Sequence, residues 1–200
     1  MGRGRPRQFD PDEVLSIALE VFWDHGFEDA GVEQILQRSG VGRQSLYNTF
    51  GDKRRLFGLV FERYAEASEG AWEELLAGGT GPLEGLRRFL DRWSACPPDI
   101  EGRGCLMVSS INALAEREDE IAEQAVAHLD RQRERLRRTF EDAVNAGELP
   151  SEVDPRAWSA RWLALVIGMA TLAKLPDRAT SVAAVGSAAR AELEALVPAG

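Results

Sequence analysis

Hydrophobic residues recur along the chain at three- and four-residue intervals, the spacing of one face of an α-helix. The first such segment begins at Asp10, where Asp and Pro11 form a typical helix start, and it ends near Gly26. Its inward positions are Val14, Ile17, Ala18, Val21 and Phe22. The pattern predicts an amphipathic helix over this segment.

Two shorter helical patterns follow between Val32 and Lys53, separated by Gly40-Val41-Gly42. In the second, which runs from Arg43 to about Phe50, Leu46 and Phe50 face inward. Its outward positions are Arg43, Gln44, Ser45, Tyr47, Asn48 and Thr49. Side chains of these types contact phosphates and base edges in a DNA major groove. The two patterns and the glycine turn predict a helix-turn-helix that reads double-stranded DNA.

The remainder of the chain lacks this DNA-contacting chemistry and is also helical in pattern. Gly78 to Pro82 is a clear break, after which five amphipathic segments follow. We predict an all-α protein of about nine helices in two parts. Residues 1–63 form an N-terminal arm and a three-helix helix-turn-helix DNA-binding domain. Residues 64–200 form a C-terminal helical ligand-binding and dimerisation domain.

The last two helical segments have faces that a single chain would leave uncovered. The first begins at Asp154-Pro155 and is apolar on nearly every side, with Trp158, Trp162, Leu165, Val166, Met169 and Leu172. The second, from Ser181 to Leu196, alternates core positions with Ala, Gly and Ser, which permit close helix approach. A helix that is apolar all round requires cover on all sides. We therefore predict that these two helices form half of a four-helix homodimer interface.

The net charge of −9 is unusual for a DNA-binding protein, but its distribution matters more than its total. Acidic and basic residues nearly balance up to Arg63, and the excess of acid lies beyond it. The N-terminus carries Arg3, Arg5 and Arg7, which predict an arm that follows the DNA backbone or enters the minor groove. Lys53 begins a basic turn with two arginines, which predicts a phosphate contact. Five arginines between 131 and 138 are interpreted as a solvated face.

The first third of the chain resembles the DNA-binding domain of the TetR/AcrR family of bacterial transcription regulators. The resemblance rests on Phe22, Gly26-Phe27, Ile35, Gly40-Val41, Leu46-Tyr47, Phe50, Lys53 and Leu56. It implies a homodimer that dimerises through its last two helices and binds a palindromic operator, most often as a ligand-responsive repressor. This chain departs from the family pattern at Gly31 and Gly42, where relatives usually place hydroxyl residues that cap a helix and contact phosphate.

The predicted DNA contacts combine the resemblance with the residue chemistry. They are Arg3, Arg5, Arg7, Gly42, Arg43, Gln44, Ser45, Tyr47, Asn48, Thr49 and Lys53. Gln44 is the predicted base contact, because its amide can pair bidentately with adenine. Arg43 can read guanine or a phosphate, and Asn48 can contact either a base or the backbone. With two hydroxyl caps missing, more of the backbone contact is expected from Tyr47, the basic turn at Lys53 and the arginine arm.

A small apolar or aromatic effector is expected to bind among the C-terminal helices. The candidate effector-binding residues are Trp72, Trp93, Cys105, Met107, Phe140, Trp162 and Met169. Two alternatives remain open. Cys105 follows a Gly-Arg-Gly turn at a helix start, which favours the thiolate and suggests an electrophile or oxidant sensor. The chain can also be a helical protein-interaction module with a vestigial helix-turn-helix.

Other chemistry finds little support in the sequence. His25 and His128 are isolated, and the two cysteines form no metal-ligand spacing or disulfide scaffold, so no metal or cofactor is expected. No phosphate-binding loop, dinucleotide fingerprint or nucleophile–base pair occurs, so an enzyme is not expected. The N-terminus lacks the apolar core of a signal peptide. The longest apolar run, Trp162 to Ala173, is too short to span a membrane, so the protein is expected in the cytoplasm.

Overall fold

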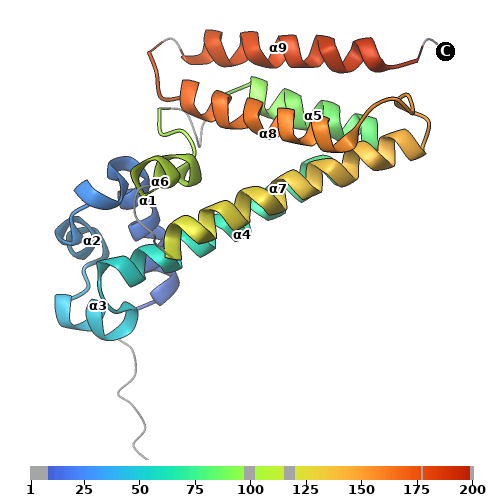
Figure 1. The fold of residues 1–200 in the computed structure, drawn as a ribbon. Helices are drawn as coiled ribbons and strands as arrows, with labels where there is room; N and C mark the ends of the chain where they lie inside the picture. The colour runs from blue at the N-terminus through green and yellow to red at the C-terminus, as the bar shows by residue number, and fades with distance from the viewer. Residues whose placement is uncertain (1–8, 97–101, 115–119, 177, 199–200) are drawn as a thin grey trace, which may run out of the picture. The chain divides into compact units, whose positions relative to one another are not determined.

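The computed structural model describes residues 9–96, 102–114, 120–176 and 178–198. Within these ranges the chain forms nine α-helices and no strand, which confirms the predicted all-α fold (Figure 1). The chain divides into two compact units, one ending at Tyr64 and the other beginning at Ala65. The division falls inside the long helix α4, Lys53–Ala77.

The first unit contains α1, α2, α3 and the first part of α4. Helix α1 spans Pro11–Asp29, α2 spans Val32–Ser39 and α3 spans Arg43–Phe50. The predicted cap at Asp10 is confirmed, because its carboxylate accepts a hydrogen bond from the backbone N–H of Asp12 at 2.9 Å. Gly26 adopts a positive φ of 74° and kinks α1, so helical structure resumes beyond the glycine and continues to Asp29.

An aromatic core fixes the helices of the first unit. Phe22 of α1 meets Phe57 of α4 edge-on, with ring centroids 4.9 Å apart, and Phe27 lies 5.1 Å from the Phe57 ring. Ile35 and Leu46 are buried and anchor α2 and α3 to this core. Deleting such a buried side chain costs about 2–5 kcal/mol, so α3 is held at a fixed position on the unit.

The second unit contains the end of α4 and five further helices. They are α5 (Pro82–Ser94), α6 (Leu106–Leu114), α7 (Glu120–Asn145), α8 (Pro155–Leu172) and α9 (Arg178–Leu196). Helix α7 packs against α5, α6 and α8, and α9 lies across α5 and α8 (Figure 1). The predicted cap at Asp154 is confirmed, because its carboxylate accepts from the backbone N–H of Arg156 at 2.9 Å.

Close approach and ion pairs join α9 to α5. A Cβ added at Gly186 would lie 1.8 Å from Ser94 Oγ, so only glycine permits this packing. Arg87 of α5 donates to both carboxylate oxygens of Glu194 at 2.9 and 2.6 Å. The Arg87 hydrogen bonds lower the pKa of the Glu194 carboxyl, so the pair stays ionised at neutral pH. These contacts fix α9 against α5. α9 also packs against α8.

Across the described residues, no helix combines the length and the apolar character that a membrane crossing requires. The same residues contain no group of three or more His, Cys, Asp or Glu side chains arranged to hold a metal ion.

Candidate functional site

The turn between α2 and α3 has the geometry of a helix-turn-helix. Gly40 ends α2 in the left-handed conformation, with φ 67° and ψ 8°, and its N–H donates to Leu36 at 2.9 Å. Val41, between the two helices in the chain, is buried. Gly42 is extended, with φ −68° and ψ 142°, and its carbonyl accepts the first hydrogen bond of α3. The chain reverses within three residues because glycine tolerates the positive φ at position 40.

Helix α3 has one buried face and one polar face. Leu46 and Phe50 are 1% and 3% exposed, and they hold the helix against the core of the unit. The solvent-exposed side chains on this helix are Arg43, Gln44, Ser45 and Asn48, and those half-buried are Tyr47 and Thr49. All six outward residues predicted from the sequence are thus on one helix, and four of them are fully accessible to a partner. This is the residue set that reads base edges and phosphates in a major groove.

Two contacts organise the polar face of α3. Gln44 Nε2 donates a hydrogen bond to Asn48 Oδ1 at 3.1 Å, so one amide orients the other across one helical turn. Arg43 forms an ion pair with Glu33 of α2, and both side chains are more than half exposed. An exposed pair of this kind is worth about 0–1 kcal/mol, so a DNA phosphate or a guanine can displace the carboxylate.

The two helix N-termini lack side-chain caps. Neither Gly31 at the start of α2 nor Gly42 at the start of α3 provides a side-chain hydrogen bond to the helix that follows. The first N–H groups of an α-helix have no partner within the helix, and they carry a partial positive charge. Both N-termini therefore remain suited to an anionic group such as a DNA phosphate.

The basic turn at the start of α4 has a more defined structure than the sequence indicated. Asp52 caps the helix by accepting from the backbone N–H of Arg55 at 2.9 Å. Lys53 donates to the carbonyl oxygen of Glu28 at 3.0 Å, and its ammonium lies 5.1 Å from the Phe27 ring centroid. The Lys53 charge is thus held against the end of α1, whereas Arg54 and Arg55 are exposed. The predicted arm residues Arg3, Arg5 and Arg7 lie outside the described residues.

The second unit brings most of the predicted effector-binding aromatics into one core cluster. Trp72 lies 6.1 Å from Trp93 between ring centroids, and Phe140 lies 4.9 Å from Trp162. Phe89, which the sequence interpretation did not select, joins the two pairs at 4.6 Å from Trp72 and 6.0 Å from Trp162. The other predicted members, Met107 and Met169, are fully buried, and Cys105 is half-buried just before α6.

One atom of this aromatic core is unsatisfied. Trp162 is 1% exposed, and its indole Nε1–H is buried with no acceptor among the described residues. A buried donor without a partner costs about 1–3 kcal/mol, so an unpaired donor in a core requires an explanation.

A buried polar network between α4 and α7 was missed by the sequence interpretation, which treated His128 as isolated. His128 is 3% exposed, and its Nδ1 lies 3.0 Å from Glu69 Oε1. Its Nε2 lies 3.4 Å from the amide nitrogen of Gln132, which is also buried. Burial lowers the pKa of His128, so the imidazole is neutral at pH 7. The signal was present in the spacing, because His128 and Gln132 continue the three- and four-residue series from Ala125.

Next to this network, an open groove of about 880 Å³ runs between α4 and α7. Arg131 Nε donates to Glu69 Oε1 at 2.8 Å on one side of it, and Arg135 donates to Glu73 at 3.4 Å. None of the seven predicted effector residues lines this groove. Six of the seven predicted residues are buried and Cys105 is half-buried, whereas the groove is lined mostly by polar side chains that the sequence did not point to.

A helix-turn-helix with an exposed polar second helix, followed by an all-helical unit, defines a helix-turn-helix transcription regulator that binds DNA. Residues 14–60 match the family described as bacterial regulatory proteins, tetR family. Residues 82–189 match the family described as tetracyclin repressor-like, C-terminal domain. The chain belongs to the TetR family, which confirms the resemblance seen in its sequence.

Individual relatives agree with this assignment. The chain is 30% identical over 165 residues to YezE of Bacillus subtilis (strain 168), an uncharacterized HTH-type transcriptional regulator, covering 80% of this chain and 83% of YezE. It is 26% identical over 156 residues to the HTH-type transcriptional repressor ComR of Escherichia coli (strain K12), covering 76% of this chain and 73% of ComR. Both relatives are described as regulators and not as enzymes.

Solved structures show the same fold. A cysteine mutant of the TetR family regulator CifR, complexed with a 26-bp double-strand operator DNA, superposes with a TM-score of 0.79 and 26% identity, covering 98% of this chain and 100% of CifR. A TetR regulator from Chloroflexus aurantiacus J-10-FL superposes with a TM-score of 0.83 and 20% identity, covering 93% of this chain and 94% of that one.

Proposed function

We propose that the chain is a homodimeric, ligand-responsive repressor that binds a palindromic operator through α3. The observation that carries the proposal is the exposed polar face of α3, where Arg43, Gln44, Ser45 and Asn48 are accessible on a helix anchored by Leu46. The relative ComR is described as a repressor, and CifR is described in complex with operator DNA. Each subunit would place its α3 in the major groove of one operator half-site.

The division of labour on α3 follows from the chemistry of its side chains. Gln44 would contact a base, since the amide of glutamine matches the donor and acceptor edge of adenine. Arg43 would exchange its ion pair with Glu33 for a contact to a guanine or a phosphate. Tyr47 and Thr49, which are half-buried, would contact the backbone with Ser45, Lys53 and the uncapped N–H groups at Gly42. Asn48, already paired with Gln44, would contact a base or the backbone. The arm at Arg3, Arg5 and Arg7 would extend this contact along the DNA.

The exposed surface of α8 and α9 supports the proposed dimer. On α8 the exposed residues Ala164 and Gly168 lie four positions apart. On α9 Ala184 and Ala188 are exposed at the same spacing. These positions form strips of small residues on which a second pair of helices can pack closely, as in a four-helix bundle. A two-fold dimer would present two α3 helices, which is why a palindromic site is expected.

The aromatic cluster of the second unit supports a small aromatic or apolar effector. The unpaired indole N–H of Trp162 offers a hydrogen bond to an acceptor group of a ligand. Such a ligand would have to displace side chains that now pack around Phe140 and Trp162. Occupancy would be coupled to DNA release only if the ligand favours a conformation with weaker operator affinity.

A mobility-shift assay on the DNA upstream of the protein's own coding region, followed by footprinting, tests the central proposal. We expect a protected palindrome and a mass for the bound protein that corresponds to two chains. Absence of specific binding to any palindrome in a genome-wide pull-down would refute the repressor proposal. The salt dependence of binding separates a DNA reader from a protein-interaction module with a vestigial helix-turn-helix, because phosphate contacts make affinity fall steeply with salt.

Regulation through Cys105 is a second candidate, favoured by the surroundings of this residue. Cys105 is half-buried, whereas Cys96 is buried, and its carbonyl accepts from Ser109 in the first turn of α6. The Lys174 side chain, whose ammonium donates to Ser109 Oγ at 2.6 Å, packs against the preceding Gly104. A cysteine beside a helix start and a lysine side chain matches the surroundings in which reactive cysteines are found. If a Cys105→Ser variant still leaves DNA on oxidant treatment, the thiol mechanism is excluded.

A further inference from the structure

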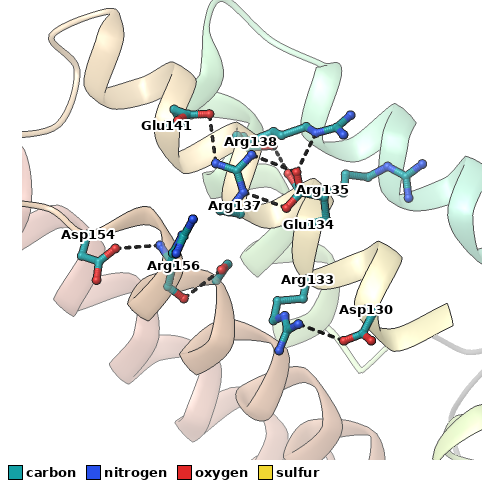
Figure 2. Close-up of polar contacts among 11 residues, drawn as sticks. Asp130, Arg133, Glu134, Arg135, Arg137, Arg138, Glu141, Asp154 and Arg156 are labelled. Carbon is teal, nitrogen blue, oxygen red and sulfur yellow. Dashed lines mark hydrogen bonds and ion pairs between the residues drawn. The ribbon is translucent and has the colours of Figure 1, made fainter. Parts of the chain in front are cut away.

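A second, smaller groove of about 390 Å³ lies between α7 and α8. Its lining residues are Arg133, Glu134, Arg137, Arg156, Ser159 and Ala160. Figure 2 shows that the arginines come from both helices and that the charged side chains concentrate on this part of α7. The lining thus contains three guanidinium groups and one carboxylate, of which Arg133 and Arg137 also pair with Asp130 and Glu141 beside the groove.

The carboxylate in this groove is already engaged by arginines of its own helix. Arg137 donates to both oxygens of Glu134 at 2.7 and 2.8 Å, and Arg138 donates to one of them at 3.0 Å. Hydrogen bonds from Arg137 and then from Arg138 lower the pKa of Glu134 to about 2. Arg137 also donates to Glu141 at 3.0 Å, and Arg133 forms an ion pair with Asp130 at 2.9 Å (Figure 2).

Arg156 of α8 is different from these arginines. Its backbone N–H donates to Asp154 and its carbonyl accepts from Ser159 Oγ at 3.0 Å. Its guanidinium has no ion pair or hydrogen bond with any residue that the structure describes. In Figure 2 the Arg156 side chain extends from α8 toward Arg137 on α7. Two like charges that face each other across a groove repel, and an anion placed between them removes this repulsion.

We propose that the groove is a binding site for a small dianion, either a phosphate-type oxyanion or a dicarboxylate. The planar guanidinium of Arg156 has five N–H donors and pairs bidentately with two oxygens of such a ligand. Arg137 also lines the groove, and its three nitrogens donate to Glu134 and Glu141, which leaves two of its five N–H donors for a ligand. Arg133, whose side chain is 52% exposed, can exchange Asp130 for the ligand at little cost.

The groove has a suitable size for such a ligand. At about 390 Å³ the groove can admit a small dianion together with water. The bound dianion would bridge α7 and α8 and would stabilise their packing. The site is separate from the aromatic cluster, and neither its existence nor its test depends on DNA binding.

Isothermal titration of the full chain with inorganic phosphate and with succinate, at constant ionic strength set by sodium chloride, tests the proposal. We expect saturable binding of at least one dianion, and the preferred one identifies the ligand type. An Arg156→Gln variant should bind it about tenfold or more weakly, because one charge-assisted hydrogen-bonded pair is lost. Arg133→Gln should cause a smaller loss, since this residue has an alternative partner.

Arg138→Gln is the matched control. It removes one positive charge from the same segment of α7, and Arg138 shares Glu134 with Arg137 but does not line this groove. The Arg138→Gln variant should bind the dianion with an affinity within about twofold of that of the unaltered chain, because an exposed charge outside the site contributes little. Equal losses in Arg156→Gln and Arg138→Gln, or no saturable binding of either dianion, would overturn the proposal. Dissociation of a dimer by Arg156→Gln in sedimentation would also overturn it, because the groove would then be a subunit contact.

Discussion

Helices α3 and α7 both carry long polar side chains on their surfaces, but with different chemistry. On α3 the exposed groups are one arginine and the neutral hydrogen-bonding residues Gln44, Ser45 and Asn48. On α7 they are mostly ions. Its five arginines between 131 and 138 each form an ion pair with a carboxylate of the same unit. Glu134 and Arg138, one turn apart, form one of these pairs at 3.0 Å.

The difference shows that the density of basic residues is a poor guide to a nucleic-acid interface in this protein. The arginines of α7 alternate with their carboxylate partners along the helix, so this face has little net charge to attract an extended DNA backbone, whereas amides and hydroxyls on α3 can pair with base edges. α3 contains far fewer charges than α7 and is nevertheless the helix that we propose contacts DNA. This interpretation leads to four predictions, of decreasing effect.

Removing one arginine from α3 should weaken DNA binding far more than removing one arginine from α7. Arg43→Ala should weaken operator binding by about 1–3 kcal/mol, or about 5- to 150-fold, because a guanidinium contact to guanine or phosphate is lost. Arg138→Ala, on the exposed face of α7, should change the affinity by less than about twofold. Fluorescence anisotropy with labelled operator DNA measures both. Comparable losses in the two variants would show that long-range charge, and not the position of the residue, determines binding.

A second prediction concerns the neutral residues of α3. Gln44→Ala should reduce affinity for the cognate operator by about 1–2 kcal/mol. Affinity for an operator with one substituted base pair at the position that Gln44 contacts should stay nearly unchanged, because discrimination at that position is lost. Binding to a panel of operators with single base-pair substitutions measures the effect. A uniform loss across all sequences would instead identify Gln44 as a backbone contact, and the Gln44–Asn48 hydrogen bond would then have a purely positioning role.

The α3 face was predictable from the sequence because the signals are local. Gly40, the inward Leu46 and Phe50 and the bounds of α3 all follow from residues within one short segment. The kink at Gly26 was only partly anticipated, since a positive φ there was expected but the continuation of the helix to Asp29 was not. In this case the residues after the glycine resume helical geometry where the sequence indicated a helix end.

The α7 contacts were less predictable because their partners are distant in sequence. His128 and Glu69 are 59 residues apart, so the polar pair becomes recognisable only when α4 and α7 lie side by side. The volumes of the two grooves likewise depend on packing between elements. The aromatic residues chosen for an effector site were selected by size, and size alone does not distinguish a ligand contact from packed core.

The inward side of α7 supplies a third prediction, on stability and pH. Burial lowers the pKa of His128, so below about pH 6.5 the unfolded chain takes up a proton that the folded chain does not. The free energy of unfolding should therefore be retained above pH 6.5 and should fall as the pH decreases below it. Burial opposes the shift, but hydrogen bonds from Arg131 and His128 lower the pKa of Glu69, so the stability that Glu69 contributes is lost only as the pH falls below about 4.5.

Urea denaturation at pH 7.5 and 5.5 measures this dependence. His128→Gln should show a smaller decrease between the two pH values than the unaltered chain, whatever its stability at pH 7.5. His25→Gln, at the exposed end of α1, is the matched control and should leave the decrease unchanged. If His128→Gln decreases as steeply as the unaltered chain, His128 is not the group responsible.

The smallest predicted effect concerns the missing caps of the helix-turn-helix. Gly42 has φ −68° and ψ 142°, and a Cβ added there meets no atom within 4 Å, so serine fits without strain. Gly42→Ser should raise the free energy of unfolding by about 0.3–0.5 kcal/mol, because the hydroxyl caps an N–H of α3. Operator affinity should also rise by a few-fold, since the hydroxyl can donate to a phosphate at the helix N-terminus.

Gly40→Ser separates this effect from a general effect of serine in the turn. Gly40 has a φ of 67°, so a side chain there is strained, and the variant should lose about 1 kcal/mol of stability. Thermal unfolding and fluorescence anisotropy on the same samples measure stability and affinity together. If Gly42→Ser stabilises the fold but weakens operator binding, the backbone at position 42 must approach a phosphate too closely for a side chain. The DNA interface would then require glycine at position 42. In that case α3 would contact the phosphate through its backbone N–H groups and not through the side-chain hydroxyl that is usual in its relatives.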